Sequence, residues 1–282
     1  MSVITFVNNS EEETGKTMSL VAIATNMAIE NNNRILIIST TNKEDKIRNC
    51  YFGEKQEKNS LQEIMGESKN TIDTENGIEG IAKIARSNKL TPDTITNYTR
   101  VVFKDRLEVI FGTEKKDIYE DMQEKDIAEE YIDLISVANM YYDKVFVDLD
   151  SNIDEDIREQ ILNRSNLIIL NTNQNFSSLK KLKEKKAEWK SLRNLILIGR
   201  YDRFSKYNVK NITRFLEEKN QVLTIPYNTL FFEAMNEANV QDLFLSLRKK
   251  LDSDDKNTFF IEEIKRASEK IEYRLQELQA MI

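Results

Sequence analysis

Short blocks of Val, Ile, Leu and Phe recur along this chain, and segments with helical spacing separate them. Each block is almost continuously apolar, which is typical of a parallel strand that helices cover on both faces. The alternation of such strands with helices predicts an α/β fold with three layers and a doubly wound, mostly parallel sheet. We expect strands at residues 3–7, 34–39, 106–111, 144–148, 166–171, 194–198 and 221–225.

The segments between these blocks carry apolar residues three and four positions apart, as amphipathic helices do. We expect helices at residues 16–30, 80–85, 126–140, 153–162, 176–191 and 209–218. A last helix at 257–282 has an apolar stripe formed by Phe260, Ile264, Ala267, Ile271, Leu275, Leu278 and Ile282. The expected organisation is one domain at residues 1–252, with a helical insertion at about 55–105, and a C-terminal amphipathic helix at 253–282.

Missing residue types exclude several kinds of site. The 282 residues include no histidine, which excludes His-based triads and the common His-ligated metals. Cys50 is the only cysteine, so neither a disulfide framework nor a Cys-rich zinc site can form. The 41 Lys and Arg against 48 Asp and Glu exclude a bulk nucleic-acid coat, although a local basic patch stays open. No apolar run approaches the roughly 18 residues of a membrane span, and the first residues do not form a signal peptide. We expect a cytoplasmic protein.

The first expected strand leads into a loop that ends in Gly15-Lys16-Thr17 and then into a helix. This is the end of a Walker A motif in its strand–loop–helix context. The N–H groups and the dipole at the helix start favour an anion. Lys16 would reach the β- and γ-phosphates, and the Thr17 hydroxyl would bind Mg²⁺. The match is partial, because Ser10 stands at the first glycine position of G-x-x-x-x-G-K-[ST].

A second motif follows in the order that a P-loop protein requires. The expected strand at 144–148 ends in Asp148, which is the Walker B pattern, and this carboxylate could hold Mg²⁺ through water. The alternative is that Gly15-Lys16-Thr17 is an ordinary helix start and Asp148 an ordinary acid at a strand end. The two motifs together favour a nucleotide site with Mg²⁺ between Thr17 and Asp148.

These motifs resemble those of the ParA/MinD group of deviant-Walker P-loop ATPases, and the resemblance covers roughly residues 1–250. It also rests on the strands at 34–38 and 166–170 and on residues 198–202 and 225–228. Residues 106–112 and 225–228 look most like the TadZ/CpaE-like branch, whose members localise secretion and pilus machines. The resemblance implies ATP and Mg²⁺ as cofactors, and nucleotide contacts from Glu13, Thr14, Gly15, Lys16, Thr17, Met18, Arg200, Pro226 and Tyr227.

The loop departs from the family pattern K-G-G-x-G-K-T. The first lysine, which in the family crosses the dimer to touch the partner's phosphate, is Glu11 here, and the next two glycines are Glu12 and Glu13. Carboxylates repel a polyphosphate, and residues other than glycine hinder the approach of the backbone to it. This degenerate Walker A motif predicts weak ATP binding, and the alternative is that ATP and Mg²⁺ have both been lost.

Positions that the family uses for hydrolysis and adenine recognition also differ. The water-activating aspartate after the second strand falls on Ser39, and its companion falls on Thr41. The asparagine that contacts adenine falls on Gly199. Because a group that handles the proton of the attacking water is worth about 10²–10⁴-fold in rate, we expect hydrolysis to be slow or absent. No residue is assigned a catalytic role.

Two charged surfaces have alternative interpretations. The lysines of the expected helix at 176–191 either bind DNA or an anionic membrane, or form a solvated face, which the acidic composition favours. The C-terminal helix resembles a membrane-targeting tail, but its polar face has mixed charge with acid in excess, which is poor for anionic lipid. Packing on the domain or pairing between subunits is favoured, and stable membrane insertion is not expected.

The leading hypothesis is a ParA/MinD-like, nucleotide-binding spatial organiser. It would form a homodimer and recruit a protein partner of a secretion, pilus or conjugation machine, which would bring a cytoplasmic protein to a membrane-associated assembly. The first alternative is a pseudo-ATPase scaffold that dimerises without nucleotide. The second is a DNA-segregation ATPase, against which Glu11, Ser39 and Thr41 argue.

Overall fold

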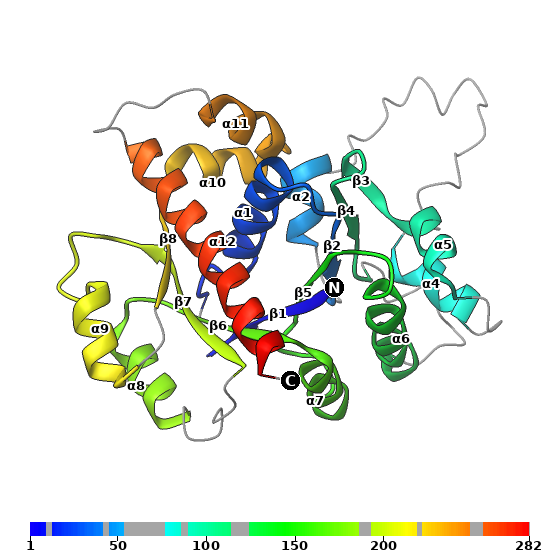
Figure 1. Ribbon diagram of the computed structural model, residues 1–282, viewed down its shortest axis with the longest axis horizontal. Coiled ribbons are helices and arrows are strands. Elements are labelled where there is room, and N and C mark those ends of the chain that lie inside the picture. The colour runs from blue at the N-terminus through cyan, green and yellow to red at the C-terminus, as the bar shows by residue number, and fades with distance from the viewer. Residues whose placement is uncertain are drawn as a thin grey trace, which may run out of the picture.

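A computed structural model describes residues 1–9, 13–41, 45–53, 77–85, 90–113, 124–185, 193–218, 222–248 and 256–281. Its centre is a sheet of eight strands in the order β3-β4-β2-β5-β1-β6-β7-β8 (Figure 1). All neighbouring strands are parallel except β3 and β4. The strands are β1 (Ser2–Asn8), β2 (Ile35–Ser39), β3 (Arg100–Phe103), β4 (Leu107–Ile110), β5 (Lys144–Asp148), β6 (Leu167–Thr172), β7 (Asn194–Tyr201) and β8 (Leu223–Pro226).

Seven of these strands confirm the sequence prediction, and β3 is an eighth that it missed. The residues of β3 fall at the end of the segment expected to be a helical insertion. The strand pairs antiparallel with β4 at one edge of the sheet, and of its four residues only Val102 is buried. Because an edge strand is covered less fully than a central one, it lacks the continuous apolar run that marks the others.

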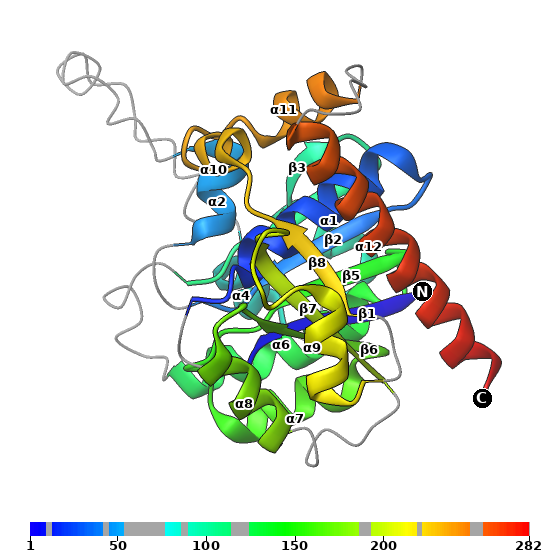
Figure 2. The same cartoon turned by 90° about the vertical axis from the view of Figure 1, so that its left-hand side faces the viewer.

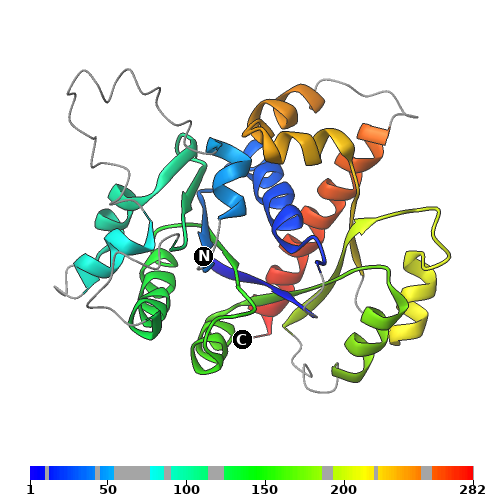
Figure 3. The same ribbon diagram turned by 180° about the vertical axis from the view of Figure 1, so that it is seen from behind.

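Helices cover both faces of the sheet, which confirms the three-layer α/β prediction (Figures 1 and 3). Successive side chains of a strand point to opposite faces, so in β1 Ile4 and Phe6 belong to one core and Val3 and Val7 to the other. The first core contains α1 (Lys16–Glu30), α2 (Lys46–Phe52), α10 (Thr229–Asn236), α11 (Val240–Leu247) and α12 (Lys256–Ala280). The second contains α4 (Ile78–Ala85), α5 (Pro92–Ile95), α6 (Glu124–Ala138), α7 (Glu155–Arg164), α8 (Phe176–Lys185) and α9 (Val209–Leu216).

The C-terminal helix α12 packs on the same sheet as the rest of the chain. Its apolar stripe is buried as predicted from Phe260 to Leu275, and Leu278 packs at the edge of the same core. Ile282 lies outside the described residues. The helix runs back along the sheet, so that its last turn reaches the start of β1, where Gln279 Nε2 donates to Ser2 Oγ over 3.4 Å (Figure 2). None of the described helices is long and apolar enough to cross a membrane.

Candidate functional site

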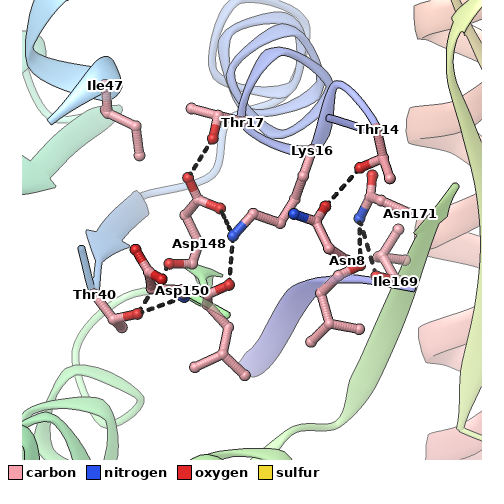
Figure 4. A network of polar contacts seen from close by, with 12 residues as sticks. Asn8, Thr14, Lys16, Thr17, Thr40, Ile47, Asp148, Asp150, Ile169 and Asn171 are labelled. Atoms are coloured by element: carbon pink, nitrogen blue, oxygen red, sulfur yellow. Dashed lines mark hydrogen bonds and ion pairs between the residues drawn. The ribbon is translucent and has the colours of Figure 1, made fainter. Parts of the chain in front are cut away.

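The loop between β1 and α1 ends in a glycine that the backbone requires. Gly15 has φ 75° and ψ 23°, in the left-handed region that side chains disfavour, and Lys16 is the first residue of α1. Thr14 Oγ1 donates to Asn8 Oδ1 over 2.5 Å and so closes the loop onto the end of β1 (Figure 4). Within the part of the chain that the structure describes, no side chain caps α1 and no acid lies in its first turn. The N–H groups of that turn are therefore suited to an anion.

Lys16 lies against the end of β5. Its Nζ is 2.6 Å from Asp148 Oδ1 and also donates to the backbone oxygen of Leu149 (Figure 4). The two side chains are only 10% and 9% exposed. The P-loop lysine and the Walker B aspartate thus form a nearly buried ion pair.

Asp148 is the centre of a small polar network. Thr17 Oγ1 donates to Asp148 Oδ2 over 2.7 Å, so the two residues predicted to hold Mg²⁺ are brought together. Thr40 Oγ1 donates to the backbone oxygen of Asp148 and accepts from the N–H of Asp150 over 2.8 Å (Figure 4). The network joins the first turn of α1 to residues that follow β2 and β5.

The sheet register explains why these residues meet. Asp148 is the register partner of Phe6 in β1 and of Ser39 in β2, so all three lie near the carboxyl ends of adjacent parallel strands. In doubly wound sheets this edge is where ligands bind. The position that the family uses for its water-activating aspartate, Ser39, is therefore beside Asp148 but carries no carboxylate.

Glu13 is paired with two cations at the mouth of the loop. Its Oε2 is 2.9 Å from Arg200 Nη2, and its Oε1 is 3.5 Å from Lys46 Nζ. The hydrogen bond from Arg200 and the charge of Lys46 lower the pKa of the Glu13 carboxyl. The repulsion expected from this carboxylate is thus offset, whereas Glu11 and Glu12 lie outside the described residues.

Arg200→Ala is expected to raise the pKa of Glu13 toward its ordinary value, because the largest cause of the lowering is removed. A carboxyl whose pKa is lower in the folded state stabilises the fold at neutral pH. That contribution is lost as the pH falls through the folded-state pKa. The measurement is a carboxyl ¹³C NMR titration. Arg203→Ala is the control, because Arg203 lies over the rings of Phe204 and Phe259. An unchanged Glu13 titration in Arg200→Ala would show that the pair does not form in solution.

Gly199 lets β7 approach the P-loop closely. A Cβ at this position would lie 2.1 Å from the backbone oxygen of Thr14, and one at Gly15 would lie 3.3 Å from Arg200 Cγ. The register of β7 with β8 shifts after Ile198, and Arg200 takes a left-handed conformation with φ 51°. The end of β7 is thus shaped around the loop that the family uses for phosphate.

Of the remaining residues predicted to contact a nucleotide, Pro226 and Tyr227 lie at the candidate site, whereas the side chain of Met18 does not. Pro226 pairs with Tyr201 at the end of β8, and Tyr227, which is 52% exposed, donates its N–H to the Tyr201 oxygen over 3.2 Å. Both lie at the same sheet edge as Arg200. Met18 belongs to α1, and its side chain is buried in the first core. Only its backbone would be available to a nucleotide.

Asp45 is a buried residue near this edge that sequence reasoning missed. It caps α2 through the N–H of Ile47 at 2.9 Å, and its other oxygen accepts from the N–H of Gly112 over 2.9 Å. Burial raises the pKa of its carboxyl. A Cβ at Gly112 would lie 2.1 Å from the Thr41 oxygen, so the chain after β2 is clamped against the end of β4. Because the helix that Asp45 caps was itself not predicted, its position before a helix gave no signal in the sequence.

The donor set fits Mg²⁺ with a phosphate chain better than a metal held by protein alone. Thr17 and Asp148 supply the hard oxygen ligands that Mg²⁺ prefers, and Lys16 supplies a cation. Among the described residues, no group of three or more Cys, Asp or Glu could hold a metal ion. A cation at this site would therefore complete its coordination with oxygens from water or a ligand.

The comparisons with known proteins concern the fold. No protein-family model matches the chain, and no curated protein matches its sequence. A ParA-family ATPase from Chlorobium tepidum matches the structure with a TM-score of 0.66 at 15% identity, over 92% of this chain and 96% of that one. A plasmid partition protein from Borrelia burgdorferi, bound to AMPPNP, gives 0.59 at 16% identity over 99% and 98%. MinD from Pyrococcus horikoshii, complexed with Mg-ADP, gives 0.63 at 12% identity over 96% of each chain.

The chain has the ParA/MinD fold. The matches cover nearly all of it, from the P-loop to α12. In this ParA/MinD-like structure Lys16, Thr17 and Asp148 lie together, as the sequence motifs require. Their use in binding a nucleotide remains a prediction.

Proposed function

We propose that this protein is a nucleotide-binding spatial organiser of the ParA/MinD type, which binds ATP weakly with Mg²⁺ and turns it over slowly or not at all. The observation that carries the proposal is the Lys16–Asp148–Thr17 cluster at the start of α1, which no side chain of the described residues caps. It combines a cation, two hard oxygen ligands and a helix N-terminus at the carboxyl edge of a parallel sheet.

Each residue has a distinct part in the proposed binding. The N–H groups around Gly15 would donate to phosphate oxygens, and Lys16 would leave Asp148 and neutralise the phosphate charge. Thr17 and Asp148 would then be free to hold Mg²⁺, which supplies further neutralisation when bound. Arg200, Pro226 and Tyr227 would border the nucleotide beyond β7 and β8.

Weak binding and slow turnover have separate physical reasons. A nucleotide must separate Lys16 from Asp148 before it gains the lysine, which lowers its net affinity. Turnover is slow because neither Ser39 nor Thr41 can orient water as a carboxylate does.

Titration of Mg·ATP into the protein by calorimetry tests the proposal. We expect a saturable heat that disappears in Lys16→Ala and persists in Lys180→Ala, a matched control whose side chain is 65% exposed on α8. Thermal melting of both variants checks that they remain folded. Equal heats in wild type and Lys16→Ala would contradict a P-loop site.

A nucleotide-free dimeric scaffold is the second candidate, and the ion pair also favours it. Asp148 neutralises the charge of Lys16, and the Leu149 oxygen accepts a hydrogen bond from it. Lys16 therefore does not require a phosphate. Light scattering beside the calorimetry separates the two functions. The scaffold requires a dimer that is the same with and without millimolar Mg·ATP, together with no heat of binding.

The proposal also covers the partner of the protein and its cellular role. We propose a homodimer that recruits a secretion, pilus or conjugation component, in keeping with the resemblance to the TadZ/CpaE-like branch. DNA segregation is the competing role, and it requires salt-sensitive DNA binding that depends on ATP. Localisation of a fluorescent fusion to an envelope machine, rather than to the nucleoid, would favour the first role.

A further inference from the structure

Helices α8 and α9 and the chain that precedes α9 enclose a hollow of about 370 Å³. We call it the α8–α9 hollow. Its wall is mainly apolar, formed by Phe176, Leu179, Tyr207, Ile212 and Phe215. Phe176 is 49% exposed although it is the first residue of a helix that packs on the sheet. An apolar concavity that remains open to solvent is typical of a binding surface.

Three aromatic rings form one continuous wall. The ring centroids of Phe176 and Tyr207 are 6.1 Å apart, and those of Phe176 and Phe215 are 5.5 Å apart. Lys206 Nζ lies 5.1 Å from the Tyr207 centroid, and Lys183 Nζ lies 5.1 Å from that of Phe215. An apolar surface is thus bordered by two ammonium groups, of which that of Lys183 is paired with Glu217 Oε1 at 2.8 Å.

The surroundings of the hollow are basic in an acidic protein. Residues 176–185 and 202–218 together carry eight Lys or Arg and four Asp or Glu, whereas acids exceed bases over the whole chain. The sequence alone favoured a solvated face for the lysines of α8. The structure adds aromatic residues from three separate segments beside them, which a solvated face does not require.

The hollow is held in shape by hydrogen bonds between its two sides. Gln174 Nε2 donates to the backbone oxygens of Asp202 and Tyr207 over 3.0 and 2.9 Å, and Gln174 Oε1 accepts from the Asp202 N–H over 2.7 Å. Asn9 Nδ2 donates to the Ser178 oxygen over 3.0 Å, which fixes the first turn of α8 to the end of β1. A preformed hollow lowers the entropic cost of binding.

We propose that the α8–α9 hollow is the docking site for an acidic peptide segment of a partner protein, whose leucine or aromatic side chain enters the hollow and packs on the wall of Phe176, Tyr207 and Phe215. A carboxylate of the segment pairs with Lys206 at the rim, whereas Lys183 is already paired with Glu217. The proposal names the chemistry of the partner that the proposed function recruits. The docking itself needs no nucleotide, so this proposal can be tested independently of nucleotide binding at the P-loop.

The aromatic geometry favours a peptide over single-stranded nucleic acid. Bases bind by stacking on open ring faces. Phe176 stacks on the Tyr207 ring, the Lys206 ammonium lies over the same ring, and the Lys183 ammonium lies over Phe215. Both rings therefore already have neighbours over them. An inserted side chain requires only the concave apolar space between the helices.

Selection from a random peptide library displayed on phage tests the proposal without knowledge of the partner. The wild-type protein is the target, and the Phe176→Ala variant removes peptides that bind elsewhere. We expect the selected sequences to combine Asp and Glu with a Leu, Phe or Trp. A selected set with no excess of acid, or with basic residues, would overturn the proposal.

The selected peptide is then synthesised with a fluorophore, and its affinity is measured by polarisation. Phe176→Ala and Lys206→Glu should each weaken it about tenfold or more. Lys270→Glu is the matched control, because its ammonium lies 5.0 Å from the Tyr273 ring on α12, outside the hollow. An equal loss in the control, or no loss in the two hollow variants, would refute the assignment.

Two further experiments distinguish a peptide from a nucleic acid in the hollow, and peptide docking from nucleotide binding at the P-loop. An oligo-dT strand that binds the wild type, competes with the peptide and is lost in Lys206→Glu would assign the hollow to nucleic acid instead. Lys16→Ala should bind the peptide as well as wild type does when nucleotide is omitted. Loss of peptide binding in Lys16→Ala alone would overturn the independence of the hollow from the P-loop.

Discussion

Asp148→Ala is expected to lower the free energy of unfolding by about 3 kcal/mol. The change leaves the Lys16 ammonium nearly buried with only the Leu149 oxygen as partner, and removing one member of a buried pair strands the other charge. Thr17 loses the acceptor of its hydroxyl as well. Urea denaturation followed by circular dichroism measures the loss.

A double-mutant cycle shows whether the pair causes this loss. Lys16→Met with Asp148→Ala should cost less than the sum of the two single changes, because no charge is then stranded. Glu184→Ala is the control for an exposed pair, since Glu184 is 63% exposed and 3.9 Å from Lys180, and it should cost about 0.5 kcal/mol or less. Additive losses in the cycle would mean that Lys16 and Asp148 do not interact in solution.

Gly199→Ala is expected to destabilise the fold by about 3 kcal/mol and to reduce any ATP affinity with it. The added Cβ would lie 2.1 Å from the Thr14 oxygen, so either β7 or the P-loop must shift. Both the melting temperature and the calorimetric affinity for Mg·ATP measure the effect.

Gly53→Ala provides the matched comparison for this steric argument. Gly53 has φ 70°, but its nearest neighbour to an added Cβ is Ala238 Cβ at an ordinary 3.5 Å. With ψ 171°, Gly53 lies in a backbone region that is essentially restricted to glycine, so we expect about 1–3 kcal/mol of destabilisation from backbone strain alone, with ATP affinity unchanged. If both glycine variants behaved alike, the close approach of Gly199 to the P-loop would not be the cause.

The sequence could predict those parts of the fold that local patterns encode. Strands such as Lys144–Asp148 are buried along their whole length, so their apolar runs are continuous. The edge strand Arg100–Phe103, of which only Val102 is buried, and the helices Lys46–Phe52 and Val240–Leu247 were not predicted. Their structure comes from tertiary contacts.

The candidate site also contains residues that sequence motifs could identify and contacts that only the fold creates. Lys16, Thr17 and Asp148 were found because motif and order are written in the sequence. The Glu13–Arg200 pair was not foreseen, because the two residues are 187 positions apart and no spacing rule connects them. The wall of Phe176, Tyr207 and Phe215 likewise exists only once β6 and β7 are neighbours.

The contact of α12 with the start of β1 identifies the side of the molecule at which it can be attached to a surface. Ser2 and Gln279 are hydrogen-bonded at the amino edge of the sheet, whereas the P-loop follows the other end of β1. Seven residues of strand separate these edges by about 20 Å. A surface tether at Met1, which is 62% exposed next to Ser2, and a fluorophore at the exposed Gln279 would therefore both lie on the side opposite the P-loop. Single-molecule measurements of ligand binding can therefore use attachment on that side, which leaves the P-loop accessible.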